Sequence, residues 1–199
     1  MPDIVLDYHR LKTPIDHPDF SITPLKLSFG VWQKVAEVDA PSGTTAVTIS
    51  GLDGDADKAY LIYFEGALEG TATADWYLVL IPNALSLTID NVGYYAAFDG
   101  ITTSSGTWRV SLGGFMMGRT GWYVAGHMVC LGILGAMTGY RRQYIGWYHI
   151  DSPGKSSLAH HDGFTGGFWN DTTTKITSLK IATSTNTFSG KIILFKVSI

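Results

Sequence analysis

The sequence predicts an all-β protein, a jelly-roll-like antiparallel β-sandwich with an extended N-terminal arm. Its 199 residues include 23 glycines, and its acidic residues are 14 aspartates against three glutamates. Aspartate and glycine favour turns, whereas glutamate favours helices. Turn residues also recur about every 8 to 12 residues between β-branched and aromatic runs, a spacing typical of sandwiches and jelly rolls.

Residues 1–27 are predicted to form the arm, and residues 28–199 the sandwich domain. Four of the seven prolines fall within the first 24 residues, and proline removes a hydrogen-bond donor and favours extended backbone. Apolar residues among them argue against simple disorder. The arm is therefore expected to dock, either on a neighbouring subunit or back on its own domain. Its candidate interface residues are Ile4, Leu6, Ile15 and Phe20.

From residue 29 onward, β-branched and aromatic runs alternate with turns. The sequence Pro41-Ser42-Gly43 is predicted to separate the first two strands, and Pro82-Asn83 to end a later one. No helix longer than a single turn is predicted. Strands are predicted near residues 29–38, 45–49, 58–66, 75–81, 85–90, 92–98, 107–112, 122–137, 140–150, 175–184 and 190–198.

The segment Gly121–Tyr140 contains no Asp, Glu, Lys or Arg. One interpretation is a transmembrane helix. The other is a strand buried on both faces that turns at Thr138-Gly139 and pairs with residues 140–150. Five glycines and a histidine favour the strand. No membrane insertion is therefore expected.

Charge and cysteine content exclude several classes of function. A net charge of −3, from 14 basic and 17 acidic residues, excludes a basic nucleic-acid-binding footprint. The single cysteine, Cys130, excludes an internal disulfide, and its apolar neighbours indicate a buried, inert thiol. Residues 1–4 show no secretory signal. No nucleophile and base are spaced as in a hydrolase, so neither an enzyme nor a cofactor is expected.

An acidic turn offers the main candidate for a metal site. Asp53, Asp55 and Asp57 place alternate carboxylates where they could share a calcium ion. A helix-loop-helix calcium site is excluded, because Lys58 stands where that loop needs glycine and Phe64 where it needs glutamate. A looser calcium site and a solvated acidic turn both stay open.

Two further motifs resemble binding sites. His160, His161 and Asp162, with His149 upstream, form the only dense cluster of potential metal ligands. Adjacent residues of a strand point to opposite faces, so metal binding would require a loop and a third ligand. The segment Ser152–Ser156 resembles the end of a phosphate-binding loop, but His149 replaces its first glycine, and a plain turn is expected.

Aromatic and basic residues supply the candidates for surface recognition. Five adjacent aromatic pairs, such as Trp147-Tyr148 and Phe168-Trp169, would each place one ring on each face of a sheet. Some rings are therefore expected to be exposed, where they could stack on sugars, or to lie in a subunit interface. Arg141 and Arg142 are candidate interface residues, with solvated charges at a strand end as the alternative.

Three stretches taken in order resemble a group of bacteriophage virion surface proteins, the β-rich head decoration and tail-fibre-like sandwiches. They are residues 47–63, with their Gly/Asp turn, residues 134–142, with a Thr-Gly-basic hairpin, and residues 176–196, a closing strand pair. The resemblance covers roughly residues 45–199 and excludes the arm. It carries no catalytic pattern.

The resemblance implies a non-enzymatic protein displayed on a phage virion, as a capsid decoration or as a head or tail fibre. It implies a homo-oligomer, with a trimer favoured, and other virion proteins as partners. A host surface glycan is a further expected contact. The alternative hypothesis is a carbohydrate-binding β-sandwich module that uses exposed aromatic residues.

Overall fold

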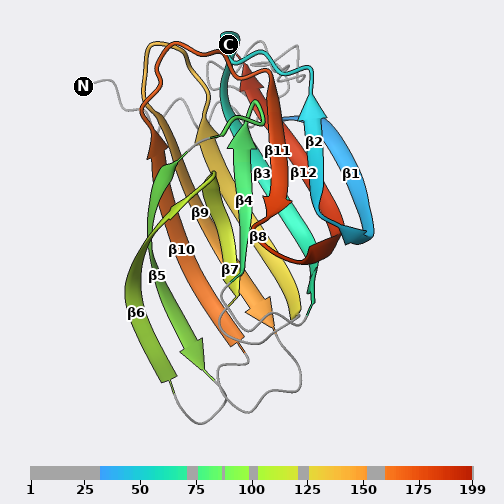
Figure 1. Ribbon diagram of the computed structural model, residues 1–199. Coiled ribbons are helices and arrows are strands. Elements are labelled where there is room, and N and C mark those ends of the chain that lie inside the picture. The colour runs from blue at the N-terminus through green and yellow to red at the C-terminus, as the bar shows by residue number, and fades with distance from the viewer. Residues whose placement is uncertain are drawn as a thin grey trace, which may run out of the picture. The chain divides into compact units, whose positions relative to one another are not determined.

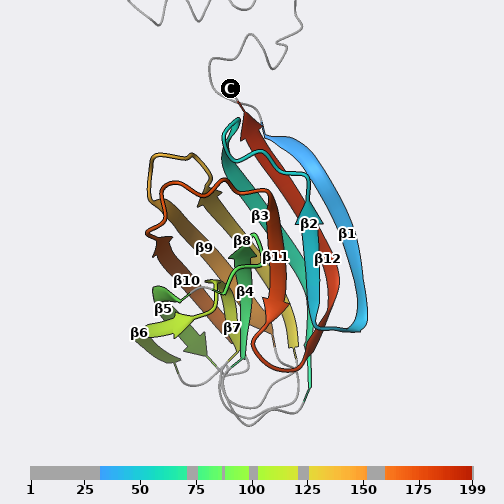
Figure 2. The ribbon, with the colours of Figure 1, turned by 45° about the horizontal axis from the view of Figure 1, so that its top comes forward.

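The computed structural model describes residues 32–70, 76–86, 88–98, 103–120, 126–151 and 160–198. These residues form twelve strands in two antiparallel sheets, with no helix among them. Figure 1 shows the smaller sheet in front of the larger one, and Figure 2 shows the same two layers from a tilted direction. The predicted all-β sandwich is confirmed.

The larger sheet has eight strands, and successive neighbours in it are antiparallel. In spatial order they are β1 (Gln33–Thr44), β12 (Thr187–Ser198), β3 (Asp57–Glu69), β8 (Gly126–Gly135), β9 (Arg142–Asp151), β10 (His160–Trp169), β5 (Ile89–Phe98) and β6 (Thr103–Leu112).

The smaller sheet has four strands. In spatial order they are β2 (Ala46–Ser50), β11 (Ser178–Thr183), β4 (Trp76–Pro82) and β7 (Phe115–Thr120). The chain passes repeatedly from one sheet to the other, so strands that are far apart in the sequence become neighbours.

The core lies between the sheets, because alternate residues of each strand point inward. In β8 and β9, buried residues alternate with exposed or half-buried ones along the whole strand. Phe64 of β3 meets Phe188 of β12 edge to face, with the ring centroids 5.8 Å apart. Other fully buried core residues include Tyr60, Ile62, Leu78, Leu80, Phe115, Met128, Cys130, Tyr148, Ile181, Ile192 and Leu194.

Several predicted strand boundaries were wrong. Strand β1 continues through Pro41-Ser42-Gly43, with a register shift between Ala40 and Thr44. Because β1 is an edge strand, the missing N–H of Pro41 need not cost a ladder hydrogen bond. Of the predicted strand at 85–90, only Ile89 and Asp90 lie in a strand among the described residues, as the start of β5, and Asn83 and Ala84 adopt positive φ after β4.

Strands β7 and β10 were not predicted. Strand β10 contains Gly163, Gly166 and Gly167, which interrupt the alternation of apolar and polar side chains that predicts a strand. Strand β7 holds two adjacent buried methionines, Met116 and Met117, so it also lacks alternation.

The uncharged segment Gly121–Tyr140 contains strand β8, and the hairpin prediction is confirmed. Strand β8 pairs with β9, and Gly139 takes a φ of 86° in the connection. None of the described residues forms a helix that could span a membrane. The expected burial on both faces is wrong: Leu131 is 43% exposed and Ile133 is 40% exposed. The smaller sheet packs on one face of the larger sheet only.

Glycines on the inner face make room for two tyrosine rings. A Cβ at Gly132 would overlap the phenol ring of Tyr144, and one at Gly163 would overlap that of Tyr148. Both tyrosines are almost completely buried, and Tyr144 stacks on Phe115 of the smaller sheet with centroids 5.6 Å apart. Burial raises the pKa of Tyr144. The rings fill the space between the layers that glycine leaves empty.

Two buried polar side chains join the sheets through Met116 of β7. The N–H of Met116 donates to Asn91 Oδ1 at 2.8 Å, and its carbonyl accepts a hydrogen bond from Thr165 Oγ1 at 2.8 Å. Strand β7 is an edge strand of the smaller sheet. Buried backbone groups need hydrogen-bond partners, and the larger sheet supplies them here.

Replacing Gly132 by alanine should lower the free energy of unfolding by about 2 kcal/mol, the typical cost of overpacking a core. The matched control is Gly135→Ala in the same strand, where a Cβ would have no heavy atom nearer than 3.8 Å. Urea denaturation of both variants gives the comparison. Equal midpoints for the two variants would contradict the tyrosine–glycine packing.

Candidate functional site

The outer face of the larger sheet, turned away from the smaller sheet, carries two adjacent rows of apolar side chains. Each row crosses six strands, because residues paired across strands lie side by side on one face. The first row is Ile193, Tyr63, Leu131, Trp147, Phe164 and Tyr94. The second row is Phe195, Leu61, Ile133, Ile145, Gly166 and Val92. We call these twelve residues the apolar face.

The apolar face is large and accessible. Ile145 is 66% exposed, Phe164 58% and Val92 53%. At strand and residue spacings of about 4.8 and 3.4 Å, the two rows cover roughly 400 Å². Exposed apolar patches of this size are often functional.

Charged groups border the apolar face on both sides and do not enter it. On one side His149 Nδ1 lies 2.9 Å from Asp162 Oδ1, and His127 Nε2 lies 3.7 Å from Glu65 Oε1. On the other side Arg109 Nη2 lies 2.8 Å from Asp90 Oδ2.

Neighbouring hydrogen-bond donors and cations lower the pKa values of two carboxyl groups at the border of the apolar face. Ser111 and Arg109 donate hydrogen bonds to Asp90 and lower its pKa. At the β1 edge the ammonium groups of Lys191 and Lys34 lower the pKa of Glu37 to about 2. These carboxylates are therefore ionised at neutral pH and fix a charged margin.

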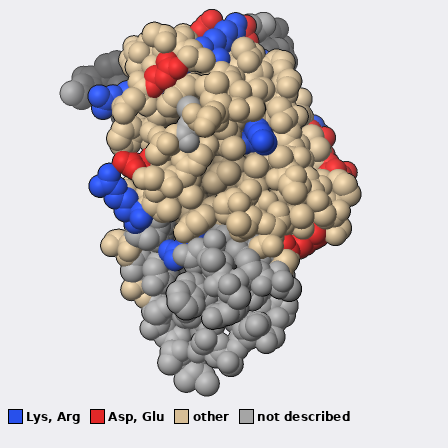
Figure 3. Space-filling model, in the orientation of Figure 1, with Lys and Arg blue, Asp and Glu red and all other residues tan. Residues whose placement is uncertain are grey.

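On the opposite side of the sandwich, charged side chains also lie mainly around the border of the surface (Figure 3). Figure 3, in which the smaller sheet faces the viewer, shows charged side chains mainly at the margins of that surface.

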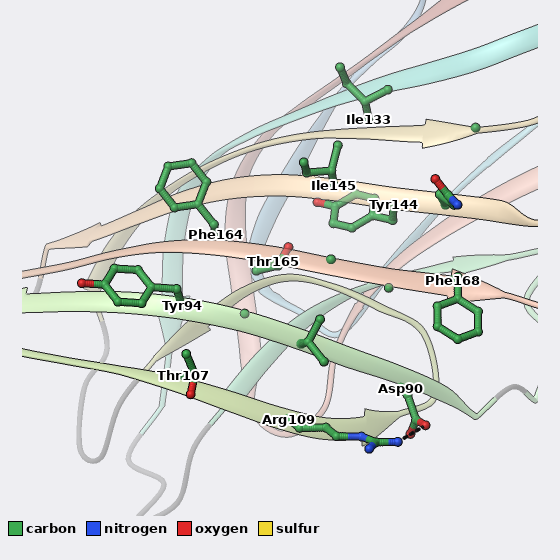
Figure 4. A pocket seen from close by; sticks show the side chains of 16 residues that line it. Asp90, Tyr94, Thr107, Arg109, Ile133, Tyr144, Ile145, Phe164, Thr165 and Phe168 are labelled. Atoms are coloured by element: carbon green, nitrogen blue, oxygen red, sulfur yellow. Dashed lines mark hydrogen bonds and ion pairs between the residues drawn. The ribbon is translucent and has the colours of Figure 1, made fainter.

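A hollow lies within the apolar face where Gly166 has no side chain. Figure 4 shows its walls, which come from strands β8, β9, β10, β5 and β6 of the larger sheet. A Cβ at Gly166 would have its nearest heavy atom, the backbone oxygen of Tyr144, at 3.6 Å, so the floor has room for a side chain. The principal wall residues are Phe164, Phe168, Ile145, Ile133, Val92 and Tyr94. An apolar group of a partner fits such a hollow by burying its surface against these walls.

In the acidic turn, Lys175 forms ion pairs with Asp53 and Asp55. Lys175 Nζ lies 2.7 Å from Asp53 Oδ1 and 3.5 Å from Asp55 Oδ2, and Lys175 is the main cause of the lowered pKa of Asp53. The third carboxylate, Asp57, points into the core. Among the described residues, no three His, Cys, Asp or Glu side chains gather in a way that could hold a metal ion.

The buried Asp57 carboxylate has charged and polar partners. Lys196 Nζ lies 2.9 Å from Oδ1, and the Tyr60 hydroxyl donates to Oδ2 at 2.9 Å. Burial and this carboxylate raise the pKa of Tyr60. The Asp57 carboxylate therefore stabilises the folded chain.

Arg142, predicted as an interface residue, is buried within the chain. Its side chain is 1% exposed and donates to the backbone carbonyls of Asp171 and Thr174. Its guanidinium carbon lies 5.3 Å from the centroid of the Trp169 ring. Adjacent strand residues point to opposite faces, and Arg141 is exposed. The interface role of Arg141 stays a prediction.

Other predicted sites fall partly or wholly outside the described residues. The arm with its interface candidates and the segment Ser152–Ser156 lie outside them, as do the side chains of His160 and His161. The structure brings together His149 and Asp162, which lie on neighbouring strands. The interface candidates in the arm are Ile4, Leu6, Ile15 and Phe20.

The aromatic pairs behave as predicted where both rings are described. In Phe168-Trp169 the first ring is 47% exposed and the second 8%. In Trp147-Tyr148 the tyrosine is buried and the tryptophan half-buried. Ile133, Ile145 and Gly166 were not predicted as surface residues. For Ile133 and Ile145 the signal was the apolar residues at both alternating positions of β8 and in the middle of β9, and Gly166 of β10 gave no such signal.

Comparison of the chain with models of protein families, with curated proteins and with solved structures found no match. The function is therefore argued from the apolar face and the hollow.

Replacing Asp57 by alanine should lower the free energy of unfolding by about 3 kcal/mol, since it leaves Lys196 and the buried hydroxyl of Tyr60 without their carboxylate partner. Asp55→Ala, in the same turn but exposed, should change it by less than about 0.5 kcal/mol. Denaturant titration measures both. A larger loss for Asp55→Ala would contradict the division of roles within the turn.

Arg142→Met should cost about 3 kcal/mol of unfolding free energy, because the buried carbonyls of Asp171 and Thr174 lose their donors. Arg141→Met, its exposed neighbour, should be nearly neutral. Thermal unfolding followed by circular dichroism distinguishes them, and equal melting temperatures would show that the buried guanidinium contributes nothing.

Proposed function

We propose that this chain is a non-enzymatic structural protein that assembles into an oligomer through its apolar face. The observation that carries the proposal is the pair of uncharged rows across six strands of the larger sheet. Water contact with so much apolar surface is unfavourable, and a partner that covers it removes that cost. Charged pairs along both borders would form the polar rim that surrounds the apolar centre of most interfaces.

The setting that we propose for this assembly is a bacteriophage virion, as a capsid decoration or a head or tail fibre. It is supported by the sequence resemblance over residues 45–199. A trimer, other virion proteins as neighbours and an arm that lies along the adjacent subunit belong to the same proposal.

The jelly-roll description is also part of the proposal. It is supported by the order β2–β11–β4–β7 of the smaller sheet, which places the last strand of that sheet between the first and the second. The larger sheet places β8, β9 and β10 between β3 and β5. A chain wound through two Greek keys gives this interleaving of early and late strands.

Carbohydrate binding is the second candidate. It is favoured by Tyr94 and Phe164 in the walls of the hollow, with the Arg109–Asp90 pair beside them. Against it, six of the twelve residues of the apolar face are leucine, isoleucine or valine. Leucine, isoleucine and valine offer no flat ring for stacking on a sugar and no hydrogen bond to a hydroxyl. Protein docking therefore fits the apolar face better.

The assembly proposal predicts that Ile145→Asp weakens self-association by about a hundredfold, because a buried unpaired charge costs several kcal/mol in an interface. The unfolding midpoint should change little, since Ile145 is exposed within one chain. Analytical ultracentrifugation over a range of concentrations measures the association.

The matched control is Thr48→Asp, which introduces the same charge at an exposed position of β2 in the smaller sheet. A full-length chain that stays monomeric at every concentration would overturn the assembly proposal. Binding to a glycan array that is lost in Tyr94→Ala would favour the carbohydrate alternative.

A further inference from the structure

We infer that the hollow at Gly166 receives an apolar side chain from the N-terminal arm, residues 1–27, of a second copy of this chain. The arm would cross the strands of the larger sheet along the apolar face. This inference rests on the proposed function, since it names the partner that covers this same surface.

The hollow is an open depression with an apolar lining. Gly166 opens its floor, Phe164 and Phe168 stand two residues away on the same strand, and Ile145 and Val92 flank it on the neighbouring strands. Rings and branched side chains around an empty position give an inserted apolar group several apolar surfaces to bury itself against.

The area of the apolar face fits an extended peptide segment better than a second sheet as the partner that covers it. Its area of roughly 400 Å² is about half of the 800 Å² that each partner of a standard interface buries. An extended segment that crosses six strands, a distance of about 25 Å, needs fewer than ten residues to do so.

The arm has the chemistry and the length for this role. Its apolar residues recur along the whole segment and include Ile4, Leu6, Ile15 and Phe20. Its prolines cannot donate to a strand ladder, which disfavours addition at a sheet edge and suits a path over side chains. Fully extended, 27 residues reach about 90 Å, which is more than twice the width of an eight-stranded sheet.

The sequence of the arm favours a second copy as the receptor. Four prolines lie in its first 24 residues, and no glycine precedes Gly30. Proline restricts the backbone and glycine frees it, so this composition favours an extended, stiff path. A stiff segment reaches an adjacent subunit more readily than it folds back on its own domain, and exchange of one segment between identical subunits is an economical route to an oligomer.

Photo-crosslinking of the full-length chain tests the inference. A benzophenone amino acid replaces Gln143, an exposed residue that lines the hollow. Copies labelled with ¹⁴N and ¹⁵N are mixed and assembled, and cross-linked peptides are assigned by mass spectrometry. We expect cross-links to residues 1–27 that join the two isotopes. The same photoreactive group at Thr48, on the smaller sheet, is the control and should not capture the arm.

Filling the hollow gives a second, independent readout. Gly166→Leu places a side chain where a Cβ meets nothing closer than 3.6 Å, so the unfolding midpoint should stay near that of the parent chain. The yield of arm cross-links from position 143 should fall about tenfold, as expected when one central anchor is excluded. Thr48→Leu is the matched control and should leave the yield unchanged.

The outcomes separate the two proposals. A monomeric chain overturns the proposed function. An oligomer whose cross-links join position 143 to residues 32–198 of another copy, or to the arm of the same copy, keeps the proposed function and overturns this inference. An unchanged yield of arm cross-links in Gly166→Leu also overturns it.

Discussion

The larger sheet has two apolar faces, and the smaller sheet covers only one of them. A sheet buries apolar side chains by packing against another layer, and in the described residues that layer exists on the inner face alone. The inner face contributes Tyr144, Tyr148 and the core around Phe64. The outer face keeps Ile145 and Phe164 in contact with solvent. The candidate docking surface is therefore a direct result of this one-sided layering.

The inner contacts also determine which residues reach the outer face. Thr165 points inward and donates to the carbonyl of Met116, so its neighbour Gly166 must point outward. A shift of β10 by one residue would place Gly166 between the sheets and break the hydrogen bond of Thr165. The buried bond between the layers thus fixes the register that opens the hollow on the other side of the same strand.

Turn chemistry made much of the fold predictable, because Gly139 and the Gly/Asp turns mark strand ends locally. The glycines of β10 removed the alternation on which strand prediction depends, and that strand was missed. At single positions, local sequence was insufficient. Asp55 and Asp57 look equivalent in the sequence, yet only Asp57 is buried, and Arg142 is buried beside the exposed Arg141. These differences depend on which alternate residues of each segment point toward the core, and tertiary packing determines that choice.

The wrong prediction about β8 is itself informative. An uncharged strand with apolar residues at both alternating positions is typical of burial on both faces. Leu131 and Ile133 lie on the outer face, which no second layer covers in the described residues. The sequence pattern and the single-chain structure agree once the outer face is covered in an assembly. A chain that functioned alone would gain solubility from polar residues at these positions, whereas an interface needs them apolar.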